Sequence, residues 1–423
     1  MKIDHIHFYV KDAQASRDWF VNHMGFHALV SGTSHDTYTT VVKSGAIYIV
    51  LSSPLSAASP IAQFLSLHPP GVADIAFVVS DLESVMEKAV ANGAKVLQPI
   101  QQQPLAQGGW KWSKIAAWGS LSHTLIEESF VATLPFVNVG DGVTQEIATR
   151  EVQRSHQRST GLSSELLPLC DRIDTIPLVP EFSGSDVTSE FFNPTESTEL
   201  SASDLRLAIA DSGLFNGIDH VVLNVASGEL EKALNWYEKV LGFQRKQAFT
   251  IQTERSGLHS QVMIHPDSGV QFPVNEPTST NSQIQEFLDV NRGPGIQHIA
   301  LQTPRIVQAI ARLRHLGLSF LSIPPSYYSQ LQLNQPTLPV SASELEEIAA
   351  QQILVDWQDE SSKALLLQTF TQPIFEEPTF FFELIERRQQ AQGFGEGNFR
   401  ALFEAIEREQ LKRGSLEMNY YDV

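Results

Sequence analysis

The chain has 423 residues, enough for two domains of ordinary size, each with its own hydrophobic core. Its net charge of −19 and pI near 5.1 argue against a nucleic-acid-binding surface and against binding to an anionic membrane. The single cysteine, Cys170, excludes an intramolecular disulfide and a cysteine-rich zinc site, and it fits a reducing compartment.

The N-terminal segment lacks the long apolar run of a signal peptide, and no stretch approaches the roughly 18 apolar residues that span a bilayer. We therefore expect a cytoplasmic protein. The first third of the chain predicts, in order, a strand, a helix, a strand, an amphipathic helix and a last strand. These elements are IDHIHFYV (3–10), SRDWFVNHMGF (16–26), GVADIAFVV (71–79), VMEKAVANGAKVL (85–97) and TLIE (124–127).

Residues 131–213 are rich in Ser, Thr, Glu and Pro and show little sustained periodicity. Such a composition predicts a partly irregular connection between two domains, although a structured elaboration packed on one domain is the alternative.

The second half of the chain repeats the pattern of the first. The matching segments are IDHVVLNV (218–225), ALNWYEKVLGF (233–243), GIQHIALQT (295–303), IARLRHLGLSFL (310–321) and ELIE (383–386). Both first helices end in Gly-Phe, and we predict that Gly25 and Gly242 are their C-caps. The repeat predicts an α+β fold of two similar domains.

Three residues of the second half are candidate iron ligands. His220, His298 and Glu383 lie in three predicted strands of one sheet. Two imidazoles and one carboxylate bind Fe(II) on one face and leave positions open for substrate and dioxygen. By strand alternation Phe381, Glu383 and Ile385 share one face, and Glu386 points to the other, which argues against Glu386 as the ligand.

The first half of the repeat is an internal control for this interpretation. His5, Asp74 and Thr124 stand where the second half has His220, His298 and Glu383. A framework role would have kept the same residues in both halves. We therefore predict a metal-free structural domain (1–135), a connection (136–213) and a catalytic, iron-binding domain (214–423).

The repeated pattern resembles the vicinal-oxygen-chelate superfamily, which builds open, cup-shaped sheets from paired βαβββ modules. The second half also resembles the 4-hydroxyphenylpyruvate dioxygenase family. The segments that carry this resemblance include FPVNEP (272–277), SQIQEFL (282–288), RGPGIQHIAL (292–301), PTFFFELIERR (378–388) and GFGEGNFRALFEAIEREQLKRG (393–414). Glu376 and Glu377 depart from the family, which often has Asp-Arg there.

The resemblance implies conversion of 4-hydroxyphenylpyruvate and O2 to homogentisate and CO2 with Fe(II) as cofactor and no separate 2-oxo acid. It also implies roles for residues around the metal. Gln297, Gln368 and Phe370 match catalytic positions, and the substrate-binding positions are Ser260, Asn275, Gln283, Phe381, Phe394, Asn398 and Phe399. By strand alternation we expect Gln297 to face away from His298.

The tail 393–414 predicts a glycine-rich turn and then a helix with an apolar stripe. Asn398 could cap that helix with its side chain. In the family this helix covers the active site like a lid, and the glycines would permit it to move. We also expect a homo-oligomer, either a dimer or a tetramer.

Other functions compete with this interpretation. Hydroxymandelate synthases use the same substrate and metal, but Pro273, Asn275 and Phe370 favour the dioxygenase. A non-catalytic protein that binds an aromatic ligand is a second alternative, against which the intact triad speaks. Extradiol catechol dioxygenases use a similar triad but lack the tail motif.

Overall fold

The computed structural model describes residues 1–34, 36–105, 108–130, 214–253, 256–333, 338–357 and 363–414. The predicted connection 136–213, with Cys170, lies outside these residues. Among the helices that are described, none is both long enough and apolar enough to cross a bilayer.

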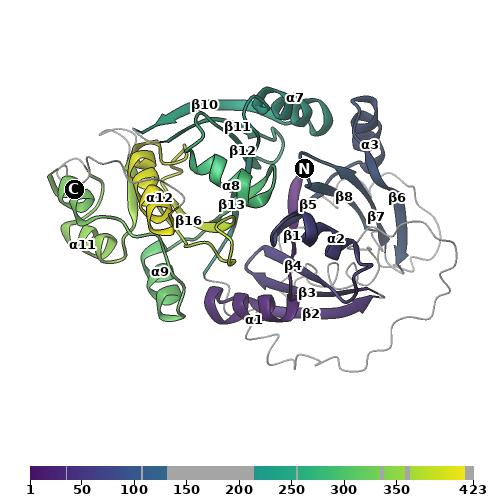
Figure 1. Cartoon of the computed structure of the whole chain (residues 1–423), viewed down its shortest axis with the longest axis horizontal. Helices are drawn as coiled ribbons and strands as arrows, with labels where there is room; N and C mark the ends of the chain where they lie inside the picture. The colour runs from purple at the N-terminus through teal and green to yellow at the C-terminus, as the bar shows by residue number, and fades with distance from the viewer. Residues whose placement is uncertain are drawn as a thin grey trace, which may run out of the picture.

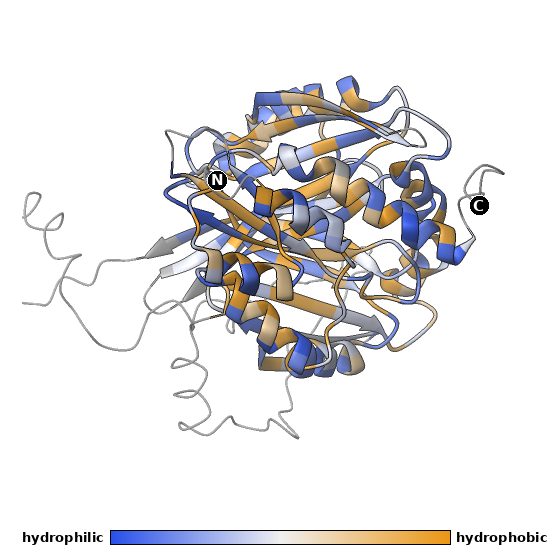
Figure 2. Cartoon of the chain, turned by 90° about the vertical axis from the view of Figure 1, so that its left-hand side faces the viewer, coloured by the Kyte–Doolittle hydropathy of each residue, from blue (hydrophilic) through white to orange (hydrophobic). Residues whose placement is uncertain are grey.

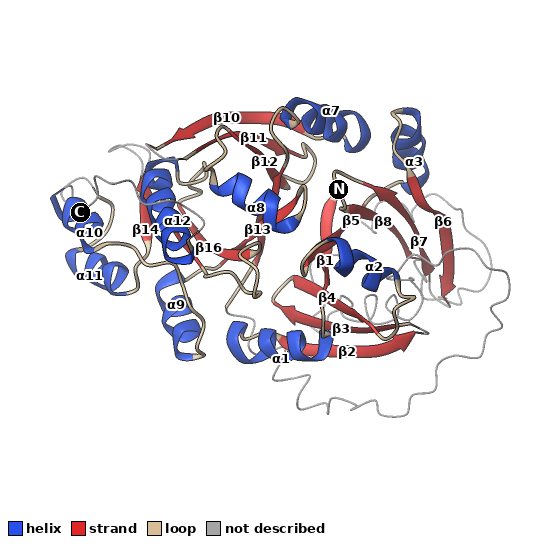
Figure 3. Cartoon of the chain, in the orientation of Figure 1, coloured by secondary structure: helices blue, strands red, loops and turns tan. Residues whose placement is uncertain are grey.

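The N-terminal part contains eight strands and three helices (Figures 1 and 3). The predicted elements occur in the predicted order, and further strands and one helix, α2, lie between them. Its elements are β1 (Lys2–Tyr9), α1 (Ala13–Met24), β2 (His27–Ser34), β3 (Thr37–Ser44), β4 (Ile47–Pro54), α2 (Pro60–Leu67), β5 (Gly71–Val78), α3 (Leu82–Ala91), β6 (Val96–Leu105), β7 (Gly108–Ala116) and β8 (Ser122–Phe130).

The C-terminal part repeats this order and adds helices late in the chain. Its elements are β9 (Gly217–Asn224), α7 (Leu230–Leu241), β10 (Gln244–Gln252), β11 (Gly257–Ile264), β12 (Gln271–Pro277), α8 (Gln283–Asn291), β13 (Gly295–Gln302), α9 (Ile306–His315), α10 (Pro325–Leu333), α11 (Ala342–Ala350), β14 (Leu354–Trp357), β15 (Leu365–Phe370), β16 (Phe381–Arg388), the 3-10 turn η3 (Glu396–Asn398) and α12 (Phe399–Arg413).

Each part forms one mixed sheet of eight strands, and the two strand orders correspond one to one. The N-terminal order is β2-β3-β4-β1-β5-β8-β7-β6, and the C-terminal order is β10-β11-β12-β9-β13-β16-β15-β14. In both sheets the two βαβββ modules meet at the central antiparallel pair, β1 with β5 and β9 with β13. The predicted α+β fold of the vicinal-oxygen-chelate type is confirmed.

The first helix of each part ends at the predicted glycine. Gly25 and Gly242 adopt φ values of 68° and 78°, the left-handed region in which a Cβ is unfavourable, and each backbone N–H donates to a carbonyl of the last helical turn. Both predicted C-caps are confirmed.

Strand alternation divides each sheet into a packed face and a concave face. Val221 and Leu223 of β9 lie in the main hydrophobic core, whereas His220 points to the opposite, concave side. Figure 2 shows hydrophobic stretches along the strands, while the helices carry both hydrophobic and hydrophilic residues. Helices α8 and α12 lie across the concave face of the C-terminal sheet, and α2 lies across that of the N-terminal sheet (Figure 1).

The two parts pack against each other through their first helices. Phe20 of α1 contacts Phe382 of β16 with ring centroids 5.9 Å apart. Reciprocally, Tyr237 of α7 lies against β8, where its hydroxyl donates to Nε2 of His123 over 3.2 Å. This pseudo-symmetric contact leaves both concave faces on the outside of the interface.

The departure at Glu376 and Glu377 lies at this interface. Lys11 Nζ lies 3.1 Å from Glu376 and 3.3 Å from Glu377. The pair of carboxylates therefore contacts the N-terminal part, and these exposed ion pairs contribute little to stability.

Candidate metal centre and adjoining pocket

His220, His298 and Glu383 converge at the centre of the C-terminal concave face. Strands β9, β13 and β16 are neighbours, and Ala300 of β13 pairs with both His220 and Glu383. Glu383 Oε2 lies 3.2 Å from His220 Nε2 and 3.6 Å from His298 Nε2. The three ligand atoms all lie within 4.8 Å of one another.

The chemistry of this cluster fits a divalent cation. Within the described residues Glu383 Oε1 and His298 Nδ1 are buried and lack a hydrogen-bond partner. Burial, followed by the charge of His220, holds the pKa of His298 well below its usual value, so that this imidazole is neutral and can bind a metal. Two imidazoles and one carboxylate match the donor set of non-haem iron sites.

His220 has a different electrostatic environment. Burial alone would lower its pKa, but the nearby charge of Glu383 and the hydrogen bond to Asp219 raise it to about 9. The Nδ1–H of His220 donates to Asp219 Oδ1 over 2.8 Å, which leaves Nε2 directed toward Glu383. A metal ion at this site would displace a proton from His220.

The N-terminal sheet holds the three counterparts at equivalent register positions. Ala76 of β5 pairs with both His5 and Thr124, as Ala300 does with the two C-terminal ligands. Asp74 accepts a 2.6 Å hydrogen bond from Ser122, and its Oδ1 lies 3.5 Å from the buried ammonium of Lys114. In this cup a lysine supplies the positive charge that the carboxylate needs.

Glu386 has a framework role, as its predicted orientation implied. Its Oε2 accepts a 2.7 Å hydrogen bond from the backbone N–H of Ile306 at the start of α9. Glu127 does the same for the N–H of Leu82 at the start of α3, also over 2.7 Å. Because both halves keep this glutamate, it caps a helix in each of them.

Phenylalanine rings line the candidate centre. Phe381 stacks on His298 at 4.8 Å with an interplanar angle of 16°, and Phe370 meets the same imidazole edge-on at 6.4 Å. Phe394 lies edge-on to His220 at 5.0 Å. Phe399 does not contact the triad, but packs against Phe249, which in turn lies 6.5 Å from Phe394.

Polar side chains occupy the same concave face. Ser260 pairs with Asn275 across β11 and β12, and Asn275 Nδ2 donates to Asn224 over 3.3 Å. Among the described residues, the hydroxyl of Ser260 and both amide atoms of Gln368 are buried without a partner. These groups could bind a polar ligand. The sequence interpretation missed Asn224, whose only signal is its place four residues after His220, on the same face of β9.

The expected orientation of Gln297 was wrong. The register between β13 and β9 shifts between Ile296 and His298, so that a β-bulge interrupts the alternation. Gln297 is buried and lines the same pocket as Gln283 and Phe381. Gln297 and His298 are adjacent in sequence, but both therefore face the concave side of the sheet, where the site lies.

The expected helix cap at Asn398 was also wrong. Asn398 has helical φ and ψ values and its side chain forms no capping hydrogen bond. Its Oδ1 instead accepts a 2.7 Å hydrogen bond from the hydroxyl of Tyr327, which also receives a bond from the N–H of Val355. Asn398 is tied to β14 and α10, and the sequence interpretation missed Tyr327.

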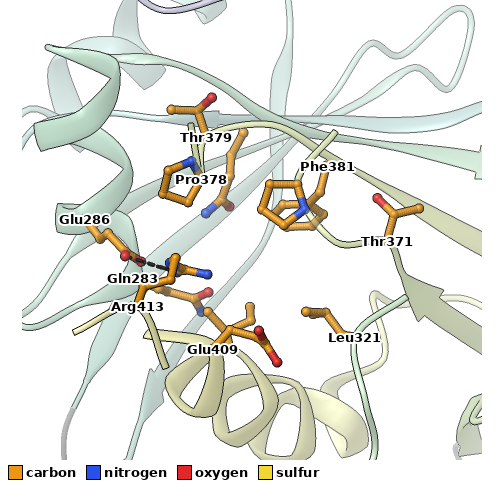
Figure 4. Close-up of a pocket in the computed structure, with 12 residues that line it drawn as sticks. Gln283, Glu286, Leu321, Thr371, Pro378, Thr379, Phe381, Glu409 and Arg413 are labelled. Carbon is orange, nitrogen blue, oxygen red and sulfur yellow. Dashed lines mark hydrogen bonds and ion pairs between the residues drawn. The ribbon is translucent and has the colours of Figure 1, made fainter. Parts of the chain in front are cut away.

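A pocket opens between α8, α12 and the segment that precedes β16 (Figure 4). Its empty volume of about 420 Å³ includes space that is open to solvent. Phe381 and Gln283 are among its lining residues. Arg413 of α12 lies 3.0 Å from Glu286 of α8 at its side. Helix α12 thus covers the pocket on the concave face, as the family resemblance implied.

Comparisons with known proteins agree with this geometry. Two family models of the glyoxalase/bleomycin resistance protein/dioxygenase superfamily match residues 4–112 and 217–332. A 4-hydroxyphenylpyruvate dioxygenase of Dictyostelium discoideum is 34% identical over 98% of this chain and 99% of its own length. One of Yarrowia lipolytica is 33% identical over 98% and 93%.

A solved structure shares the fold across nearly the whole chain. It is a mutant of 4-hydroxymandelate synthase from Streptomyces coelicolor, with a TM-score of 0.70 and 24% identity over 97% of this chain and 98% of that one. At this level of identity the likeness concerns the fold alone.

Proposed function

The chain belongs to the 4-hydroxyphenylpyruvate dioxygenase family, and we propose that it converts 4-hydroxyphenylpyruvate and O2 to homogentisate and CO2 with Fe(II). The observation that carries the proposal is the buried triad of His220, His298 and Glu383. The triad adjoins the pocket through Phe381, which stacks on His298 and lines the pocket together with the amides of Gln283 and Gln297. The net reaction balances without a further reductant, because the keto acid is oxidised by both atoms of dioxygen.

The triad would hold the metal by three ligands and leave the other positions to the reactants. Fe(II), when bound, supplies a Lewis acid and a template that places the keto acid beside dioxygen. The protein contributes a fixed donor set, because the strand registers of β9, β13 and β16 fix all three ligands.

Aromatic side chains would orient the phenol ring. Phe381 stacks on the imidazole of His298 and Phe370 meets the same imidazole edge-on, so both rings lie beside a candidate metal ligand. Phe394 borders the other imidazole. A flat ring held between such faces gains offset or edge-to-face contacts, and the apolar walls exclude water from the oxidation.

Amide and hydroxyl groups would bind the polar ends of the substrate. We assign the keto-acid side to Gln297 and Gln368, and the phenol side to Ser260, Asn275 and Gln283. The unpartnered amide of Gln368 and hydroxyl of Ser260 support this assignment, because buried polar atoms require a partner.

Helix α12 would close the site over the bound substrate. Phe399 and Asn398 lie at its start, and Asn398 contacts Tyr327 rather than the ring pocket in this arrangement. We assign both residues to closure, in which they complete the substrate-binding wall.

The experiment that tests the proposal measures oxygen uptake and CO2 release together. Purified protein loaded with Fe(II) should consume one O2 for each CO2 released from 4-hydroxyphenylpyruvate. His298→Ala is the inactive control, because it removes one ligand while the neighbouring strand remains paired. Binding of the keto acid without oxygen uptake would contradict the proposal and would favour a non-catalytic binding protein.

A further inference from the structure

Arg387, the last but one residue of β16, contacts the outer side of the metal site. Its Nε and Nη2 donate to the two carboxylate oxygens of Asp219 over 2.7 and 2.8 Å. Asp219 Oδ1 in turn accepts from His220 Nδ1. The arginine and the aspartate are only 12% and 6% exposed, so water competes weakly for these bonds.

The same guanidinium also binds the turn that leads to α12. Its Nη1 donates to the carbonyl oxygens of Ala391 and Gly393 over 3.1 and 2.9 Å. Its central carbon lies 6.0 Å from the ring centroid of Phe394, the residue that packs edge-on against His220. One side chain therefore contacts both the support of a metal ligand and the chain that enters the covering helix.

The turn between β16 and η3 has an unusual backbone conformation. Gln389 and Gln390 have φ values of 50° and 55°, and residues other than glycine rarely adopt this backbone conformation. Such a conformation persists only where surrounding contacts impose it. The two hydrogen bonds from Arg387 to Ala391 and Gly393 provide contacts of that kind.

The N-terminal half again serves as a control. It keeps the aspartate–histidine pair, since Asp4 Oδ2 lies 2.7 Å from His5 Nδ1. Counting from the two glutamates that cap helices, Glu127 and Glu386, the position of Arg387 is occupied by Glu128. The arginine occurs with the three metal ligands, whereas the aspartate–histidine pair occurs with and without them.

We propose that Arg387 is a positioning residue that fixes the orientation of His220 through Asp219 and couples that ligand to the turn before α12. A carboxylate that holds the second nitrogen of a ligating imidazole sets its tautomer and ring orientation, and removal of such support typically weakens metal binding 10- to 100-fold. Arginine suits this role because its planar fork binds both carboxylate oxygens at once and still has a donor left for the turn.

The inference rests on the proposed metal site, and its test uses metal binding rather than turnover. Arg387→Lys keeps the charge but removes the fork. The matched control is Arg388→Lys, because Arg388 binds Glu386 and Glu344, on the other face of the same strand. Titration of the metal-free proteins with Co(II) gives the affinity, and the visible spectrum of bound Co(II) reports the ligand geometry.

We expect Arg387→Lys to bind Co(II) about 10- to 100-fold more weakly with a changed spectrum, and Arg388→Lys to match the parent chain. Backbone amides at 391–395 should also exchange hydrogen faster in Arg387→Lys only. An unchanged affinity and spectrum in Arg387→Lys would overturn the inference. Failure of the parent chain to bind Co(II) would instead refute the proposed metal site.

A double-mutant cycle separates this role from a general loss of structure. Asp219→Asn removes the charged acceptor, so it should weaken Co(II) binding on its own. If Arg387 acts through Asp219, Arg387→Lys should change the affinity little further in the Asp219→Asn background. Fully additive losses in the double variant would show that Arg387 does not act through Asp219.

Discussion

Two glutamates three residues apart on β16 should respond in opposite ways to the same substitution. Glu383 faces the metal site, and Glu386 caps α9 through the N–H of the fully buried Ile306. Glu386→Ala leaves that N–H without an acceptor, which costs about 1–3 kcal/mol. Loss of the negative charge at the helix N-terminus adds roughly 0.3–1 kcal/mol. The metal-free protein should therefore lose about 1–4 kcal/mol of unfolding free energy.

Glu383→Ala should change the stability of the metal-free protein by about 1 kcal/mol or less, because His220 can lose its proton and no uncompensated buried charge remains. Urea unfolding followed by tryptophan fluorescence, with and without Co(II), separates the two effects. At a metal concentration of 100 times Kd, binding adds about 2.7 kcal/mol to the parent chain and to Glu386→Ala.

In Glu383→Ala most of this metal-dependent gain should disappear. A metal-dependent gain that persists in Glu383→Ala but disappears in Glu386→Ala would refute the assignment of the two faces. Equal responses of the two variants would refute it as well.

Two further predictions concern His123 and Gly395. Burial lowers the pKa of His123 to about 4 from 6.5, so the folded state resists a proton that the unfolded state accepts. The free energy of unfolding should therefore fall by up to about 3 kcal/mol as the pH drops from 6.5 to 4. Equilibrium unfolding of His123→Gln should show a weaker dependence of stability on pH. An equally steep pH dependence in this variant would exclude His123 as its cause. Gly395→Ala would place a Cβ 2.2 Å from Gln368 Oε1 at a φ of 78°. Turnover should fall while Co(II) affinity stays unchanged, and unaltered turnover would contradict the role of this turn in closure.

The internal repeat made much of the fold predictable. Strand and helix order, the glycine caps and the α+β class follow from local patterns that occur twice, and two independent occurrences restrict the interpretation more than one does. The same repetition identified His5, Asp74 and Thr124 as counterparts of the triad, and the strand registers place them at equivalent positions.

Side-chain directions at irregular points could not be predicted. Alternation assigned Glu383 and Glu386 to opposite faces, because β16 pairs in an unbroken register with both of its neighbours. It failed at Gln297, because a bulge at this position in β13 interrupts the alternation, so that Gln297 does not face away from His298. No residue in the segment GIQHIAL signals that bulge.

Contacts between segments that are distant in the sequence could not be predicted from local patterns either. Asn398 is a favourable capping residue, but its side chain instead accepts a hydrogen bond from the hydroxyl of Tyr327, 71 positions earlier. The pairing of Arg387 with Asp219 likewise joins residues 168 positions apart. Such pairs depend on which strands become neighbours, and the periodicity of a single segment contains no information about its neighbours.

The measurement that tests the central claim most directly is the identity of the product formed from 4-hydroxyphenylpyruvate. Fe(II)-loaded protein should be incubated with the keto acid under O2, and the products separated by chromatography and identified by mass. Homogentisate should be the main product, and it should be absent with His298→Ala. Hydroxymandelate as the main product would contradict ring hydroxylation, and recovery of unchanged substrate would contradict the dioxygenase itself.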